Sequence, residues 1–197
     1  MNFKKVISKD AIAKMPREVF SGKIVVVDNE SSLEQALDFL SGLSQLGFDT
    51  ETRPSFSKKT HYRMSLMQIA SDDTCFLIRL NRFKQVPGAL EMFLKNEAIK
   101  KIGISLRDDF NGLHNLTNIV PANFVDLQRY VQQFGIEDMS LQKIYAILFG
   151  KKISKRERLS NWEIHTLTEA QQRYAALDAW ACLHIYQHLE RMKDGAS

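Results

Sequence analysis

Two carboxylates stand at the end of a predicted β-strand, where Asp49 and Glu51 close the segment Leu46–Glu51. Successive side chains of a strand point to opposite faces, so residues two apart share a face and these two acids lie side by side. At the end of a core strand, a divalent cation bound by both acids relieves their repulsion. An isolated Asp-x-Glu also occurs where a strand edge turns polar residues to solvent. A metal site therefore requires a fold that brings further acids to this strand end.

The hydrophobic pattern of the first half of the chain predicts mainly strands. Lys23–Val27 is a β-branched run, and Asn29–Ser32 resembles a helix start before the periodic segment Leu33–Leu46. Three neighbouring strands with short connections should form a meander. We expect them at Leu46–Glu51, Tyr62–Ala70 and Thr74–Leu80, the last two separated by the turn Ser71–Asp73.

Helices and strands alternate from Val86 onward, which together with the antiparallel start predicts an α/β fold with a mixed β-sheet flanked by α-helices. Lys151–Arg158, a strongly basic segment, is expected to be an exposed connector. Because no repeat or long linker is visible, residues 1–197 should form a single domain with its core at about 23–192. The expected helices are Ala89–Lys95, Leu106–Leu116, Ser140–Phe149 and Thr168 to about Met192, and the expected strands are Lys100–Ile104 and Phe124–Leu127.

Composition narrows the class of partner and compartment. The formal net charge of +4 and the pI of about 9.0 favour a polyanionic partner without specifying one. Cys75 and Cys182 have no second cysteine or histidine at metal-finger spacing, so we expect reduced core thiols. No apolar run reaches the roughly 18 residues of a membrane helix, and Met1–Met15 lacks the apolar stretch of a signal peptide. These features predict a cytoplasmic protein with no membrane partner.

A first source of further acids is the helix after strand Lys100–Ile104. Asp108 and Asp109 both lie in the first turn of that helix. Acids are common at this position because they complement the helix dipole, so either aspartate has a structural explanation as well as a functional one.

A second source is the last helix, where Tyr174 and Asp178 are four residues apart and therefore share a face. The neighbours of Asp178 are small or apolar, which predicts a largely buried carboxylate. An unpaired buried carboxylate is costly. Either a metal ion or a cation such as Arg173 would relieve that cost.

These motifs resemble, in the same order, those of the DEDD superfamily of 3′–5′ exonucleases, in the tyrosine-bearing DEDDy branch that includes ribonuclease D and the exonuclease domain of Werner-type helicases. The motifs are Asp49-x-Glu51, the stretch Gly103–Leu113 and Tyr174-x-x-x-Asp178. Within the second motif the family spacing favours Asp109 over Asp108. Arg173 stands where the histidine-bearing branch has its catalytic residue. Further matching stretches, which extend the resemblance from roughly Ile24 to Leu189, are Ser65–Ala70, Phe124–Leu127, Ser160–Trp162 and Leu167–Gln172.

The resemblance implies a ribonuclease-H-like fold and a two-metal-ion 3′–5′ exonuclease that releases nucleoside 5′-monophosphates. Asp49 would bridge both ions, Glu51 and Asp178 would complete the first, and Asp109 would hold the second, largely through water. A ligand set of carboxylate oxygens suits Mg²⁺ or Mn²⁺ better than zinc. The unperturbed pKa of tyrosine, about 10, is too high for a base at neutral pH. Tyr174 is therefore expected to orient the attacking water.

Basic and aromatic residues near these motifs are candidates for substrate contacts. Phosphates could be bound by the basic run Lys151–Arg158, although a solvated loop explains that run equally well. Phe56 could stack on a terminal base, but an apolar loop anchor is the commoner role. Trp162 is expected to pack in the core. The predicted substrate-binding residues are Arg53, Lys152, Lys155 and Arg156, and Lys58, Lys59 and Arg63 could also line the entry.

Other enzyme classes lack their signatures in this sequence. His184 and His188 have the spacing of a zinc protease helix without its glutamate, and no Gly-rich phosphate loop or Gly-x-Ser-x-Gly elbow occurs. The rival hypothesis is a catalytically inactive nucleic-acid-binding or helicase-associated module, which gives no chemical reason to keep four acids and a tyrosine together. No helicase motor is predicted, so a helicase or repair partner would be a separate chain. Whether DNA or RNA is the substrate is left open, because no motif specifies contacts to the 2′-hydroxyl.

Overall fold

A single mixed sheet forms the centre of the protein, whose computed structural model describes residues 3–57 and 60–195. Its six strands lie in the order β1-β4-β3-β2-β5-β6. β2, β3 and β4 are antiparallel neighbours, whereas β1 joins β4, and β5 joins β2 and β6, in parallel. The predicted meander and mixed sheet are therefore confirmed. The strands are β1 (Lys23–Val27), β2 (Gln45–Thr52), β3 (Met64–Ala70), β4 (Thr74–Ile78), β5 (Lys100–Gly103) and β6 (Phe124–Asp126).

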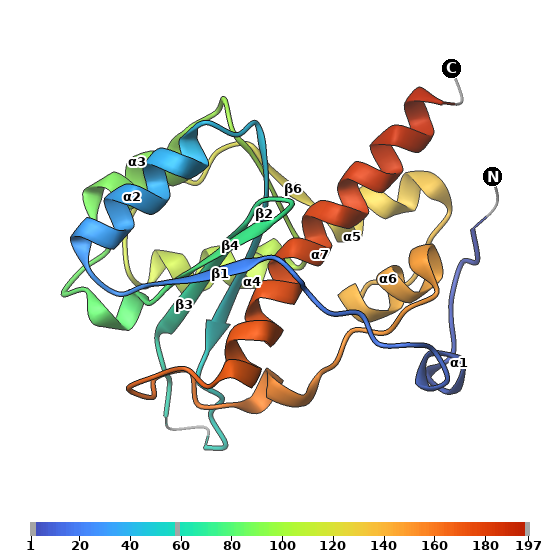
Figure 1. Cartoon of the computed structure of the whole chain (residues 1–197), viewed down its shortest axis with the longest axis horizontal. Coiled ribbons are helices and arrows are strands. Elements are labelled where there is room, and N and C mark those ends of the chain that lie inside the picture. Colours follow the sequence, from blue (N-terminus) through green and yellow to red (C-terminus); the bar gives the residue numbers. More distant parts are fainter. Residues whose placement is uncertain (1–2, 58–59, 196–197) are drawn as a thin grey trace.

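Helices cover both faces of the sheet, with α2 and α3 on one face and the long helix α7 crossing the other (Figure 1). The first turn of α2 is closed by a capping box, in which the Asn29 side chain accepts from the Ser32 backbone, as the sequence indicated. The helices are α1 (Lys9–Ala13), α2 (Glu30–Ser41), α3 (Gly88–Lys95), α4 (Leu106–His114), α5 (Leu127–Tyr130), α6 (Leu141–Phe149) and α7 (Glu169–Asp194). Short 3-10 turns lie at Leu80–Arg82, Val131–Phe134 and Arg156–Leu159.

Each face of the sheet carries its own apolar core. Beneath α7, Leu66 and Leu77 pack with Ala176 and Leu183. Under α2 and α3, side chains such as Leu37, Phe48 and Phe93 form the second core. β3 lies in the middle of the sheet, and all seven of its residues are buried. This double burial explains why the strand is mainly apolar on both faces, with Ser65 and Gln68 as its buried polar residues.

Several predicted boundaries are wrong. The first predicted helix ends at Ser41 with Gly42 as its C-cap, and Leu46 belongs to β2 instead. The short helix α1 was not predicted. Lys151–Arg158 is only partly an exposed connector. Ile153 is buried, and the backbone of Lys152 pairs with that of Arg17 in an isolated parallel β-bridge. None of the helices in residues 3–57 and 60–195 combines the length and apolar character needed to cross a membrane.

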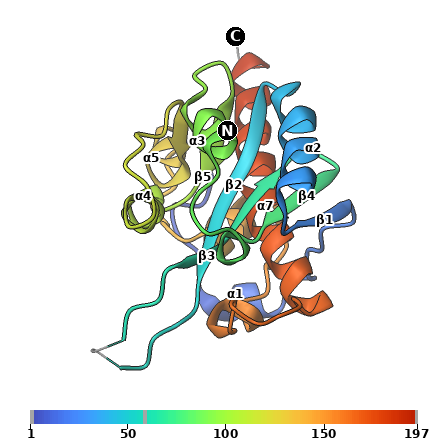
Figure 2. The same cartoon turned by 90° about the vertical axis from the view of Figure 1, so that its left-hand side faces the viewer.

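The connection between β2 and β3 projects beyond the sheet, away from the helical layers (Figure 2). It begins at Arg53, two residues after Glu51, and returns at Arg63. Lys58 and Lys59, two of the predicted entry residues, lie outside the described residues. The remainder of the connection stands beside the end of β2 that carries the acids.

Candidate active site

The close approach of α7 to β2 brings the first and third motifs together. A Cβ atom at Gly47 would lie 2.0 Å from the Ala179 carbonyl oxygen, so only glycine allows this contact. The start of α7 is fixed by a capping box between Thr168 and Gln171, with hydrogen bonds of 3.0 and 3.2 Å. These contacts fix the position of α7 against β2, so that Asp178 lies over the end of that strand.

Asp49, Glu51 and Asp178 converge there. One carboxylate oxygen from each lies within 4.8 Å of the other two. The Asp178 side chain is buried, and its Oδ1 has no hydrogen-bond partner among the described residues. Arg173, the alternative partner, is exposed and instead binds Glu169 at 2.6 and 2.9 Å. An all-oxygen group with an unpaired buried atom fits a hard divalent cation, so these three residues could hold a metal ion.

The electrostatics of this acidic triad also favour a cation. Burial is the largest cause that raises the pKa of all three carboxyls above their ordinary range. Repulsion by Asp109 and Asp178 raises the pKa of Asp49 and Glu51 further. The Tyr174 hydroxyl and the Lys155 ammonium act in the opposite direction and lower the pKa of Asp178. Without a cation, the site therefore holds protons more tightly than free carboxyls do.

Asp109 on α4 lies outside the group of three converging carboxylates, but its charge acts on Asp49 and Glu51. Its carboxylate accepts a hydrogen bond from Thr50, the residue between the two acids of the first motif. Asp108 on the same helix is exposed to solvent. Burial raises the pKa of Asp109, while the Thr50 hydroxyl lowers it. Of the two aspartates left open by the helix pattern, Asp109 is the one that lies beside Asp49 and Glu51.

The start of α4 is fixed by a residue that the sequence did not single out. The Asp126 carboxylate at the end of β6 accepts hydrogen bonds from the backbone of Ser105 (3.3 Å) and Leu106 (3.0 Å). Ser105 has a left-handed conformation with φ of 58°, which is uncommon for a residue other than glycine. Asp126 thereby sets the direction in which α4 leaves the sheet and presents Asp109.

Tyr174 lies one turn before Asp178 and is half-buried. Its ring lies 6.0 Å from that of Trp162, which is fully buried as expected. Burial, followed by the charges of Asp178 and Glu51, raises the pKa of the Tyr174 phenol above its usual value. The hydroxyl therefore keeps its proton at neutral pH and acts as a hydrogen-bond donor.

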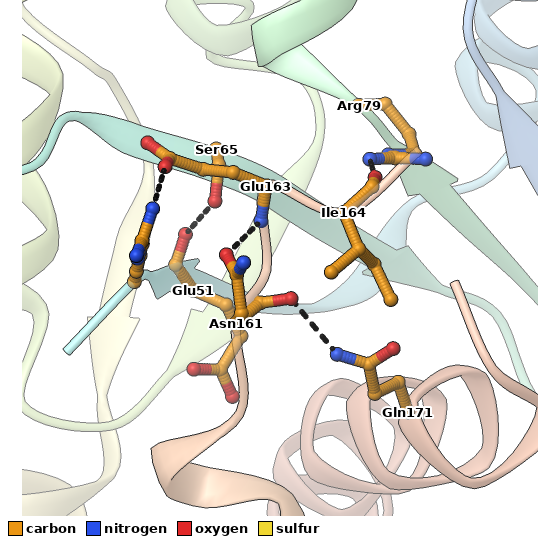
Figure 3. A network of polar contacts seen from close by, with 8 residues as sticks. Glu51, Ser65, Arg79, Asn161, Glu163, Ile164 and Gln171 are labelled. Carbon is orange, nitrogen blue, oxygen red and sulfur yellow. Dashed lines mark hydrogen bonds and ion pairs between the residues drawn. The ribbon is translucent and has the colours of Figure 1, made fainter. Parts of the chain in front are cut away.

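A polar network ties the segment before α7 to the end of β2 and to the sheet (Figure 3). Asn161 accepts from the Glu163 backbone at 3.0 Å and from Gln171 at 3.1 Å. Ser65 donates to the Glu51 carbonyl oxygen at 3.3 Å, and the buried Arg79 donates to the Ile164 carbonyl oxygen. These bonds hold Trp162 against the site.

Comparison with known proteins shows which family this chain belongs to. A model described as 3′–5′ exonuclease matches residues 24–194. The chain belongs to the 3′–5′ exonuclease family. Among curated exonuclease relatives, the bifunctional 3′–5′ exonuclease/ATP-dependent helicase WRN of Mus musculus is 33% identical over 162 residues, 80% of this chain and 12% of that protein. A 3′–5′ exonuclease of Arabidopsis thaliana is 29% identical over 162 residues, 80% of this chain and 56% of that protein. The chain thus spans less than two thirds of either relative.

Solved exonuclease structures share the fold. The Aedes aegypti Nibbler EXO domain has a TM-score of 0.82 at 24% identity, over 91% of this chain and 94% of that one. Escherichia coli RNase D has a TM-score of 0.77 at 20% identity, over 88% of this chain and 46% of that one. The predicted ribonuclease-H-like α/β fold is therefore confirmed, with the family's sheet and helices in one domain.

The four predicted substrate-binding residues of this exonuclease domain lie in different surroundings. Burial and the Arg158 charge lower the pKa of Lys155. The Asp178 charge acts in the opposite direction, which shows that Lys155 lies near the triad. Arg156 lines a cavity of about 270 Å³ beside Tyr174. Lys152 instead donates to the Ala13 carbonyl oxygen and is bound to the N-terminal segment.

Arg53, the fourth of these residues, has two partners of its own. It forms an ion pair with Glu163 at 3.2 Å, and its guanidinium lies 4.4 Å from the centre of the Tyr62 ring. Arg158 belongs to the basic run but was not selected from the sequence, although its charge lowers the pKa of Glu51. Only the folded arrangement of Arg156–Leu159 distinguishes Arg158 from its basic neighbours.

Phe56 is not a loop anchor, because 87% of the residue is exposed. It lines a cavity of about 400 Å³ with Arg53, Tyr62, Leu159 and Asn161. The exposed aromatic face thus stands at the rim of this cavity, which the β2–β3 connection shares with Leu159 and Asn161.

The two cysteines and the histidines of α7 are the other residues that the sequence singled out. Cys75 and Cys182 are free, buried thiols, as predicted. His184 is stacked against Phe149 and Trp180, with ring centres 4.4 and 4.6 Å away, so its role is in packing.

Proposed function

We propose that this member of the 3′–5′ exonuclease family is an active DEDDy enzyme. It hydrolyses the terminal phosphodiester bond at nucleic-acid 3′ ends and releases nucleoside 5′-monophosphates. The observation that carries the proposal is the convergence of Asp49, Glu51 and Asp178 within 4.8 Å, with one buried, unpaired oxygen on Asp178. Family membership supports the direction of digestion.

In the proposed mechanism, Asp49, Glu51 and Asp178 would hold one divalent ion. Asp109 would help Asp49 to hold a second, largely through water, and Mg²⁺ or Mn²⁺ would suit these oxygen ligands. When bound, these ions supply positive charge to the phosphate oxygens and lower the pKa of water. Tyr174 keeps its proton and orients the attacking water by hydrogen bonding. Thr50 holds Asp109 in place through its hydroxyl.

We further propose that the substrate strand passes the rim formed by Phe56 and the basic residues Lys155 and Arg158. The Trypanosoma brucei RNase D, a structural neighbour, has been solved as a complex with RNA U12. Nucleic acid is accordingly the proposed partner here. A cytoplasmic location and a helicase or repair partner are proposals that rest on the sequence and on the WRN relative alone.

A digestion assay tests the proposal. Single strands of DNA and RNA labelled at the 5′ end are incubated with the protein in Mg²⁺, in Mn²⁺ and in chelator. We expect a ladder of shortening products that depends on metal, and no ladder from Asp49→Asn, which removes a charge but little volume. Binding without shortening would instead identify an inactive nucleic-acid-binding module. Equal activity of wild type and Asp49→Asn would defeat the assignment of the site.

A further inference from the structure

Gln68 is an unpaired amide buried next to the acidic triad. It lies in the middle of β3 with 0% of its surface exposed. Neither its side-chain Nε2 nor its Oε1 has a hydrogen-bond partner among the described residues. Buried polar groups in proteins are nearly always paired, so a glutamine left in this state calls for a ligand or partner.

The register of the sheet places one strong acceptor directly beside this amide. Gln68 is the direct cross-strand neighbour of Asp49 in the antiparallel pair of β2 and β3. Directly opposed residues point to the same face, and their Cβ atoms are typically about 4.5–5.5 Å apart. A glutamine side chain is long enough to reach an aspartate carboxylate over that separation.

The other neighbours of Gln68 within the sheet offer no polar partner of similar strength. Along β3, Leu66 and Ala70 share its face, and Leu77 of β4 is its cross-strand neighbour on the side away from Asp49. The face is covered by α7, which contributes Ala176 and Ala179 to the same core. Among its neighbours in the sheet, Asp49 is therefore the strong acceptor that flanks this amide, and the Asp178 carboxylate of α7 converges on the same acid.

We propose that Gln68 is a positioning residue for Asp49: its side-chain amide donates a hydrogen bond, directly or through one water, to the Asp49 carboxylate in its metal-holding form. This inference rests on the proposed metal site. Carboxylates that bind metals are themselves oriented by hydrogen bonds from neighbouring residues. The orientation of Asp49 matters most in the proposed site, because this carboxylate is assigned to both ions. A neutral amide donor orients it without adding another negative charge to the group.

Two variants that remove the amide test this role, Gln68→Met and Gln68→Leu. The control is Leu77→Met, a conservative change on the opposite side of Gln68 from Asp49. Mn²⁺ affinity is measured by isothermal titration calorimetry, and the unfolding midpoint by circular dichroism in EDTA. We expect about tenfold weaker Mn²⁺ binding in both Gln68 variants. Their midpoints in EDTA should equal or exceed that of the wild type, because an unpaired buried amide has been removed.

Each other outcome has a distinct meaning. Wild-type affinity in both Gln68 variants would overturn the positioning role and leave the proposed exonuclease site intact. An equal loss of affinity in Leu77→Met would overturn it too, because a general disturbance of the core would then explain the effect. Failure of both variants to fold would show that the amide is needed for the fold, which contradicts the inference. If wild type itself bound no Mn²⁺, the proposed function and the role of Gln68 would fall together.

Discussion

The Thr50 hydroxyl donates a hydrogen bond to the Asp109 carboxylate, which joins β2 to α4 across 59 residues of sequence. Thr50 stands between Asp49 and Glu51, so strand alternation turns its side chain to the opposite face of β2 from theirs. The residue that separates the two acids of the first motif is thus the one that fixes the acid of the second.

Replacing Thr50 tests whether this bond matters for turnover. Thr50→Val keeps the β-branched shape but removes the hydroxyl, so Asp109 should lose its fixed orientation. We expect kcat to fall by about tenfold or more, the usual range for residues that orient metal ligands. Thr50→Ser, which retains a hydroxyl, is the matched control and should stay closer to wild type. Single-turnover digestion of a labelled strand in Mn²⁺ measures the effect, and equal rates in the two variants would refute it.

Removing the Tyr174 hydroxyl should separate metal binding from chemistry. In Tyr174→Phe the ring can still pack near Trp162, so Mn²⁺ affinity should be unchanged. Loss of the orienting donor should lower the single-turnover rate by about 100-fold. Tyr130→Phe is the control, because that phenol binds Glu190 and Lys193 near the far end of α7. An unchanged rate in Tyr174→Phe would exclude the orienting role.

The raised pKa values of the acidic triad predict how stability responds to pH when metal is removed. Because the folded state binds protons at Asp49, Glu51 and Asp178 more tightly than the unfolded state, stability must fall as pH rises between the unfolded and folded pKa values. In EDTA, the unfolding midpoint of wild type should therefore increase as pH is lowered from about 8 to about 6. Saturating Mn²⁺ should raise the midpoint most at the upper end of this range.

Asp49→Asn removes one of these charges and should flatten that profile. At pH 8 in EDTA, its midpoint should exceed that of wild type by roughly 2–4 °C, which corresponds to about 1 kcal/mol in a domain of this size. The difference should shrink towards pH 6. Thermal melts followed by circular dichroism measure both proteins. A wild-type midpoint that falls on acidification over this window would contradict the direction of the pKa shifts.

The parts of the site that depend on local spacing could be predicted from the sequence. Asp49 and Glu51 share a strand face, and Tyr174 and Asp178 share a helix face, for reasons that involve only neighbours in the chain. The order of strands and helices was also predictable, because apolar runs and their period carry that signal. The ends of helices and strands were harder to predict. The helix that was expected to reach Leu46 ends at Ser41.

Contacts between distant segments could not be read from the sequence. The local sequence pattern does not distinguish Lys155 from Lys152. In the fold, the Asp178 charge acts on the pKa of Lys155, whereas Lys152 donates to the Ala13 carbonyl oxygen. The helix Lys9–Ala13 has only five residues, too few to show a period. The exposure of Phe56 likewise depends on how far the β2–β3 connection projects. These features are set by tertiary packing, which propensity and spacing do not encode.

The contrast between Lys155 and Lys152 can be tested through the salt dependence of binding. If Lys155 contacts a phosphate, Lys155→Ala should reduce the slope of log affinity against log salt by about 0.7 for a single strand. Lys152→Ala should leave the slope unchanged, because its ammonium is bound to the N-terminal segment. Fluorescence anisotropy with a labelled oligonucleotide in EDTA, which prevents digestion, measures both. Equal slopes for all three proteins would mean that Lys155 does not contact a phosphate.

Phe56 provides the last test, because an exposed phenylalanine at the rim of a cavity loses little stability when it is removed. Its surroundings, Arg53, Tyr62 and Asn161, suit a base that stacks on the ring while polar groups face its edge. Base stacking on aromatic side chains contributes about 1–3 kcal/mol per base, so Phe56→Ala should weaken single-strand binding at least about fivefold. Phe56→Trp should retain binding, and Met92→Ala, another exposed apolar residue but on α3, should have no effect. If Phe56→Ala bound as tightly as wild type, the strand would have to enter by a path that avoids the β2–β3 connection.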